Sequence, residues 1–160
     1  MSKPKARQEY VDPASRQPTF SVRFLLVLVL IVLGIAWMTY YYVVVRTDPL
    51  VLDAKPGGPS YTSFMGDLDR WNYVIGLGAV ILGLALSAHP STPLGRGRGV
   101  VVGMLGCFLV GLLWICVFYV FNNQARDLDN IPIMNDLGQW NLAVGIALMG
   151  VGFTFATRWE

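Results

Sequence analysis

The residues best suited to chemistry are few in this chain. It contains one histidine, His89, and two cysteines, Cys107 and Cys116. Because helical residues rotate by about 100° each, the spacing of the cysteines places their thiols on opposite sides of one helix, where they cannot pair. A single histidine cannot form a multi-His metal site, and the sequence has no Gly-rich phosphate loop and no nucleophile beside a base. The sequence therefore predicts a protein that is not an enzyme, with no catalytic, cofactor-binding or metal-binding residues.

The other polar residues of interest lie in an eight-residue segment that occurs twice. Residues 65–72 (MGDLDRWN) and 134–141 (MNDLGQWN) share Met, Asp, Leu, Trp and Asn at the same offsets. A carboxylate near the start of a helix can satisfy free N–H groups for ~0.5–2 kcal/mol, and an amide can bond to a neighbouring helix. The segments therefore predict either helix caps or a surface that binds a partner. The residues concerned are Asp67, Trp71, Asn72, Asp136, Trp140 and Asn141.

The elements that carry these segments are expected to be long apolar helices. Hydrophobic residues make up 54% of the chain and charged residues only 14%, whereas a soluble domain carries about 25% charge. The apolar residues fall in runs that approach or exceed the length needed to cross a hydrocarbon core of ~30 Å. We expect four transmembrane helices, at residues 22–45, 71–88, 100–121 and 140–157. The second run is short, and an extension to Leu68 would lengthen it.

The internal repeat reaches upstream of the matched segments. The Gly-x-x-Trp pattern of Gly34 and Trp37 returns at Gly111 and Trp114. Self-similarity of this kind sets the unit of the fold. The sequence therefore predicts an all-α membrane protein built from two parallel helix–loop–helix repeats, with a longer connector in the first copy. We divide it into a disordered basic tail (1–20), a first two-span repeat (21–89), a link (90–98) and a second two-span repeat (99–160).

The basic residues are concentrated in the tail, the link and the C-terminus. The two long connectors hold few basic residues and also contain seven aspartates. The positive-inside rule then places both termini and the link in the cytoplasm, and the connectors outside the plasma membrane. The tail residues Lys3, Lys5 and Arg7 are candidates for contact with an acidic partner or with anionic lipid heads.

Small residues recur at matched positions of the predicted spans. In each repeat two glycines lie seven residues apart, which places each pair on one helix face. Lipid gives helices no hydrophobic reason to associate, so close backbone approach must hold them together. These glycines could pack the four spans against one another, or they could form a face for another membrane protein. The candidate packing residues are Gly76, Gly83, Gly99, Gly103, Gly145 and Gly152.

These motifs, taken in order, resemble a known family. A basic start at residues 2–7 precedes a span with Gly34 and Trp37, an outer loop and the Leu-x-x-Trp-Asn-Tyr pattern of residues 68–73. The second half repeats the Gly-x-x-Trp and Leu-x-x-Trp-Asn patterns and ends in Arg158-Trp159. This order is similar to that of the actinobacterial cell-division protein family CrgA. That family has one basic tail and two spans, so this chain resembles a tandem-duplicated form.

The resemblance implies a septal membrane protein that binds, and recruits or regulates, components of the division machinery. Its implied partners are the tubulin-like FtsZ on the inner side and an FtsI-like septal synthase in the membrane, with membrane lipids around it, possible self-association and no nucleic acid. One alternative is a small oligomeric transporter or channel-like protein, although no ionisable residue lies deep in a predicted span. A second alternative is a membrane anchor whose function lies wholly in residues 1–20.

Overall fold

The computed structural model describes residues 20–47, 55–122 and 131–158. Within these ranges the chain is helical and contains no strand. The predicted tail, with Lys3, Lys5 and Arg7, lies outside the described residues. The expectation of an all-α fold is confirmed for the part of the chain that the structure describes.

The first half of the chain forms one helical hairpin. Helix α1 (Val22–Tyr40) begins at Ser21, whose hydroxyl accepts a hydrogen bond from the backbone N–H of Phe24 at 3.1 Å, and it continues into a π-helical turn, η2 (Tyr41–Val45). A short 3-10 turn, η3 (Ser60–Thr62), leads into α2 (Ser63–Leu68). Helix α3 (Trp71–Ser87) then returns along α1.

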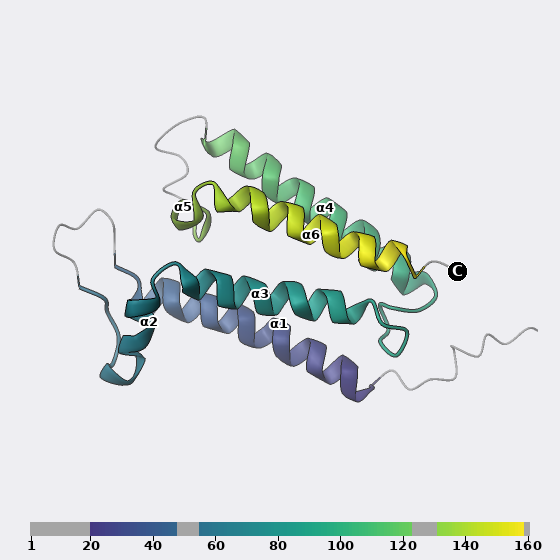
Figure 1. Cartoon of the computed structure of the whole chain (residues 1–160), viewed down its shortest axis with the longest axis horizontal. Coiled ribbons are helices and arrows are strands. Elements are labelled where there is room, and N and C mark those ends of the chain that lie inside the picture. The colour runs from purple at the N-terminus through teal and green to yellow at the C-terminus, as the bar shows by residue number, and fades with distance from the viewer. Residues whose placement is uncertain (1–19, 48–54, 123–130, 159–160) are drawn as a thin grey trace, which may run out of the picture.

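The second half repeats this arrangement. Helix α4 (Arg98–Asn122) is followed by the short α5 (Met134–Leu137), and α6 (Trp140–Ala156) packs along α4. The two hairpins meet where α3 contacts α6 (Figure 1). We call the end formed by residues 60–73 and 131–142 the turn end. The opposite end, formed by residues 20–24, 87–99 and 154–158, is called the link end.

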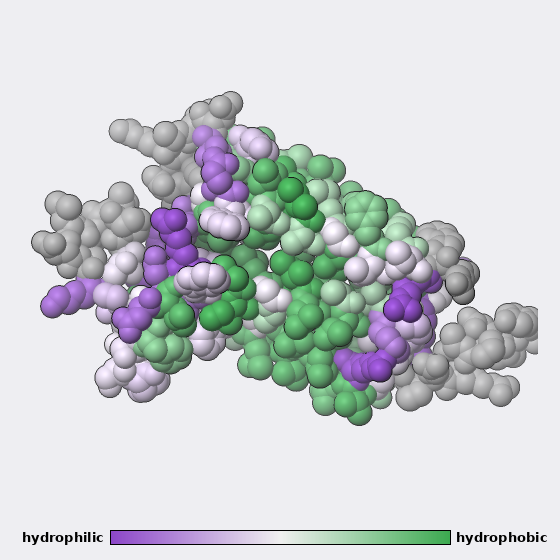
Figure 2. Space-filling view, viewed as in Figure 1, coloured by the Kyte–Doolittle hydropathy of each residue, from purple (hydrophilic) through white to green (hydrophobic). Residues whose placement is uncertain are grey.

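Two helices are long and apolar enough to cross a membrane by themselves, Val22–Val45 and Arg98–Asn122. A third candidate is the pair Ser60–Leu68 and Trp71–Ser87, which is bent by 87° at its break, and Trp140–Ala156 is apolar but shorter. Leu68 belongs to α2, which turns away from α3, so it does not extend α3 as one continuous helix. A second span that includes Leu68 remains a prediction. The face seen in Figure 2 is green and apolar along the middle and purple at both ends, as expected for a membrane protein. Four complete spans remain a prediction.

Matched glycines set the closest approach of the helices within each hairpin. A Cβ atom added to Gly34 would lie 2.6 Å from the carbonyl oxygen of Gly76, and one added to Gly111 would lie 2.6 Å from the carbonyl oxygen of Gly145. Real Cβ atoms essentially never lie that close to another heavy atom. Only glycine therefore permits this backbone separation, and it does so at equivalent places in the two hairpins.

The other candidate packing glycines divide into two groups. Gly83 lies against α1, Gly152 lies against α4, and Gly103 of α4 lies against the ring of Phe155 in α6. Gly99 is different, because a Cβ there would meet the backbone of Pro93 and Leu94 in the preceding link. The small size of Gly99 therefore permits the close turn from the link into α4.

Candidate protein-interaction site

A buried amide fixes the sharp turn that precedes α3. The side-chain Nδ2 of Asn72 donates hydrogen bonds to the backbone carbonyls of Met65, at 2.6 Å, and Asp69, at 2.9 Å. Asn72 has 0% of its surface exposed. Carbonyls at the end of a short helix have no intrahelical partner, and this side chain satisfies two of them. Asn72 therefore holds α2 at its angle to α3.

The same contact is built in the second hairpin. The side-chain Nδ2 of Asn141 donates to the carbonyls of Met134 and Gly138, both at 2.8 Å, and Asn141 is also 0% exposed. The Asn of each matched segment therefore positions a turn within the chain. Any part that these two residues play in partner binding remains a prediction, and it would act through the shape of the turn.

The backbone of both turns adopts the left-handed region at the same position. Asp69 has φ +44°, and its counterpart Gly138 has φ +50°. Glycine reaches this region at no steric cost, whereas a residue with a Cβ is strained there. The Asp69 carboxylate accepts a hydrogen bond from the Tyr41 hydroxyl at 3.2 Å, which compensates part of that strain.

The tryptophan of each segment points away from the protein. Trp71 is 65% exposed and Trp140 is 67% exposed, although each directly precedes a fully buried asparagine. Asp67 is exposed as well. Large exposed aromatic side chains on a rigid support are typical of residues that anchor an interface. The structure thus presents one indole at each of the two matched turns.

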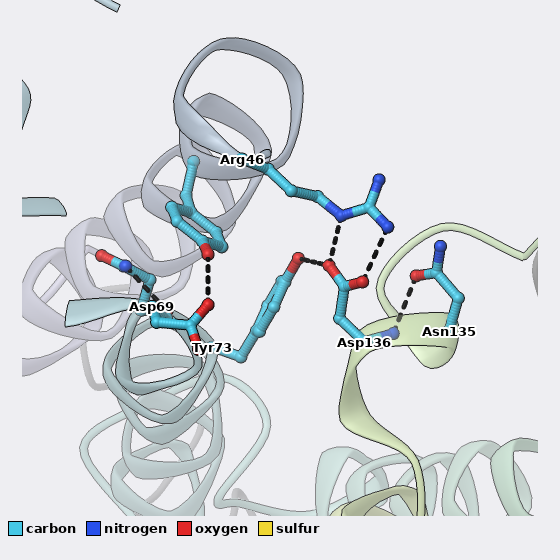
Figure 3. Close-up of polar contacts among 7 residues, drawn as sticks. Arg46, Asp69, Tyr73, Asn135 and Asp136 are labelled. Atoms are coloured by element: carbon cyan, nitrogen blue, oxygen red, sulfur yellow. Dashed lines mark hydrogen bonds and ion pairs between the residues drawn. The ribbon is translucent and has the colours of Figure 1, made fainter. Parts of the chain in front are cut away.

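Asp136 has a different environment from its counterpart Asp67. Its carboxylate accepts two hydrogen bonds from the Arg46 guanidinium, from Nε at 2.5 Å and from Nη2 at 2.7 Å, and a third from the Tyr73 hydroxyl at 2.5 Å (Figure 3). The hydrogen bond to Asp136 raises the pKa of Arg46 above its ordinary value. The Arg46 guanidinium also lies over the ring of Tyr42, 4.7 Å from its centroid. Since Arg46 and Tyr73 belong to the first hairpin, this cluster joins the two halves of the chain.

The structure does not support the capping interpretation of the two aspartates. Helices α3 and α6 begin after Arg70 and Gln139, and neither helix receives a side-chain hydrogen bond at its N-cap. The reason is the turn between the aspartate and the helix, which carries Asp67 to the surface and Asp136 to Arg46. Sequence reasoning missed Arg46 and Tyr73 as polar partners, although Arg46 directly follows the first apolar run.

The cysteines and the histidine lie where no common site can form. Cys107 is buried and Cys116 is exposed, and both are free thiols. His89 lies at the link end, where its Nε2 is in contact with Nη1 of Arg23. Among the described residues no group of His, Cys, Asp or Glu could hold a metal ion.

The fold and the site together define a class, namely helical membrane proteins built from paired hairpins whose turns present aromatic side chains. The model of the family "Cell division protein CrgA" matches residues 1–89 and 93–160. The chain belongs to this family, which confirms the resemblance found in the sequence. The boundary between the matched segments falls in the predicted link.

Curated relatives are also named cell division protein CrgA. The protein of Streptomyces avermitilis is 39% identical over 67 residues, which cover 42% of this chain and 71% of the relative. That of Corynebacterium aurimucosum is 33% identical over 66 residues, covering 41% of this chain and 66% of the relative. That of Mycobacterium tuberculosis is 32% identical over 56 residues, covering 35% and 60%. No solved structure matches this chain. These relationships support a membrane-associated role in cell division.

Proposed function

We propose that this protein spans the plasma membrane four times and binds other division proteins at the septum, where it recruits or regulates them. The observation that carries the proposal is the matched pair of turns, in which a buried asparagine holds an exposed tryptophan in each hairpin. Two such turns in one chain offer a partner two equivalent anchors.

We propose further that the two hairpins arose by tandem duplication of one two-span unit. The matched amide contacts and glycine contacts support this idea, because both recur at corresponding positions. The cluster of Arg46, Tyr73 and Asp136 then holds the two units together within one chain. On this view the protein contains in one chain what single-unit relatives could form by self-association.

The charge distribution supports an orientation with both termini in the cytoplasm. Within residues 20–47, 55–122 and 131–158, all the carboxylates lie at the turn end, on Asp67, Asp69 and Asp136. Several arginines lie at the link end, and the positive-inside rule places that end inside. The arginines concerned are Arg23, Arg96, Arg98 and Arg158. Reporter fusions between Arg96 and Arg98 test this topology, and an extracellular signal would overturn it.

The partners follow from the family resemblance and the proposed topology. The basic tail, with Lys3, Lys5 and Arg7, would contact FtsZ or another acidic surface in the cytoplasm. The spans and the exposed indoles would contact membrane partners such as an FtsI-like septal synthase. Deleting residues 1–20 separates these two contributions, because a protein that acts only through its tail would lose all localisation.

The central experiment replaces both exposed tryptophans. We expect the Trp71→Ala/Trp140→Ala protein to lose its mid-cell band when a fluorescent fusion is imaged in the native cell, and each single replacement to lose it only in part. Tyr61→Ala is the matched control, since Tyr61 is 76% exposed at the same end of the molecule. Immunoblots of the membrane fraction establish equal amounts of each variant. A normal mid-cell band in the double variant would exclude the indoles as anchors.

A further inference from the structure

A groove runs between the last turns of α3 and α6 at the link end. Its volume is about 480 Å³, and its wall is mostly apolar. Leu86 of α3 and Phe153 of α6 both expose large parts of their side chains to it. The other lining residues are Ala85, Ala88, His89, Thr154, Thr157 and Arg158. Helix α3 ends at Ser87 and α6 ends at Ala156, so the groove lies where both helices would leave the hydrocarbon core.

Two arginines lie at or next to this groove. Arg158 forms part of its wall, and Arg23 is in contact with the imidazole of His89. The Nδ1 of His89 lies 2.9 Å from Oγ of Ser91. The backbone N–H of Ser91 donates to the same Nδ1 at 3.1 Å, and the Arg23 guanidinium contacts Nε2 on the other side of the ring. Partial burial and the charges of Arg23 and Arg158 lower the pKa of His89, which favours the neutral imidazole.

The positive charges at the link end favour the binding of an anion. In the three described ranges the carboxylates all belong to the turn end, at the far side of the apolar band. Arg158 therefore lines an apolar groove, Arg23 lies next to it at His89, and the described residues place no carboxylate at this end. A ligand with a negative head and an apolar body satisfies both features, and an anionic phospholipid has that chemistry.

We propose that the groove between α3 and α6 binds one anionic phospholipid of the inner leaflet, with its phosphate between Arg23 and Arg158 and an acyl chain against Leu86 and Phe153. This inference rests on the proposed orientation in the membrane and is independent of partner recruitment. The chain's own residues 1–20 are a poorer occupant, because they contain four basic and two acidic residues. Their net positive charge would be repelled by the two arginines.

The test uses the full chain in nanodiscs of phosphatidylcholine, with and without phosphatidylglycerol, and counts retained lipids by native mass spectrometry. We expect one phosphatidylglycerol to stay bound in preference to phosphatidylcholine. Replacement of Arg23 or Arg158 by Gln should weaken its retention about fivefold each. Arg70→Gln is the matched control, because Arg70 is an exposed arginine at the turn end. It should leave retention unchanged.

A second variant tests the same site by adding charge. Thr157 is exposed and lines the groove, so Thr157→Glu should expel the phosphatidylglycerol with little effect on folding. Unchanged retention in Thr157→Glu, or in the Arg23→Gln/Arg158→Gln protein, would overturn the proposal. Tighter lipid binding after deletion of residues 1–20 would also overturn it, because it would identify the tail as the occupant. None of these outcomes depends on septal localisation, so failure here leaves the proposed function standing.

Discussion

Arg46 and Asp136 are 90 positions apart in the sequence, and their side chains form a bidentate ion pair. Only 14% of the Arg46 side chain and 19% of the Asp136 side chain are exposed. Paired, partly buried charges with two parallel hydrogen bonds are stronger and more directional than ordinary surface pairs. Asp67, the counterpart of Asp136 in the first hairpin, does not have a similar environment, because it is exposed. The two hairpins therefore have similar turns, and Asp136 of the second hairpin forms the ion pair that joins it to the first.

The first prediction concerns this ion pair. Arg46→Met should destabilise the protein by ~1–3 kcal/mol, because it leaves the partly buried Asp136 carboxylate without its charged donor. In a double-mutant cycle with Asp136→Leu, the combined change should cost less than the sum of the single changes. Denaturant unfolding in detergent micelles measures both. Arg70→Met, which removes an exposed arginine from the same end, should change the stability by less than ~0.5 kcal/mol. Additive effects in the cycle would mean that the pair does not couple the hairpins.

The second prediction concerns the glycines at the helix crossings. Gly34→Ala and Gly111→Ala should each destabilise the fold by ~1–3 kcal/mol, because the added methyl group would press on the backbone of the facing helix. Gly78 and Gly150 have open space where a Cβ would stand, and their replacement by Ala is the control. Those changes should be neutral or stabilising by up to ~1 kcal/mol, since Ala is the better helix former. Thermal unfolding in micelles ranks the four variants, and equal effects in both groups would contradict the packing argument.

The third prediction concerns Trp37 and Trp114, which occupy equivalent positions but differ in their hydrogen bonds. Trp114 donates through Nε1 to Oδ1 of Asn141 at 3.2 Å, whereas Nε1 of Trp37 and Oδ1 of Asn72 are buried and have no hydrogen-bond partner within the described ranges. Trp114→Phe should therefore cost ~1–3 kcal/mol more than the loss of apolar contact alone, because it leaves a buried carbonyl unpaired.

Trp37→Phe supplies the comparison for this pair. The same atoms are removed there, but no hydrogen bond is lost, so the cost should reflect apolar contact only. Unfolding free energies of the two variants in the same detergent give the difference directly. If Trp37→Phe proves as costly as Trp114→Phe, the first hairpin forms the same hydrogen bond in solution.

The fourth prediction concerns the strained backbone of the two turns. Gly138→Ala should destabilise the second turn by ~1–3 kcal/mol, because a Cβ is unfavourable at its positive φ even though the space around it is open. Asp69→Gly should relieve the same strain in the first turn, once Tyr41→Phe has removed the hydrogen bond that Asp69 accepts. Asp69→Gly should then stabilise the Tyr41→Phe protein, as measured by its unfolding midpoint. A fall in that midpoint would show that the Asp69 side chain has another stabilising contact.

Much of the fold can be predicted from the sequence, because the patterns that specify it are local. The long apolar runs predicted membrane helices at almost the observed bounds, since 22–45 was expected and Val22–Val45 is found. The matched Trp-Asn segments indicated an internal repeat, and the order of the motifs predicted the family. Run length, composition and self-similarity need no knowledge of how distant segments meet.

The sequence by itself determined that this is an all-helical membrane protein of the CrgA family with a segment that occurs twice. Only the tertiary structure decided which polar residues are buried and which are presented. It placed Asn72 and Asn141 inside the turns, left Trp71 and Trp140 outside, and paired Asp136 with Arg46 while exposing Asp67. The physical reason is that a hydrogen bond or ion pair depends on where two chain segments lie in space. Their placement follows from the bend at Asp69 and from the docking of α3 on α6, neither of which a local pattern encodes.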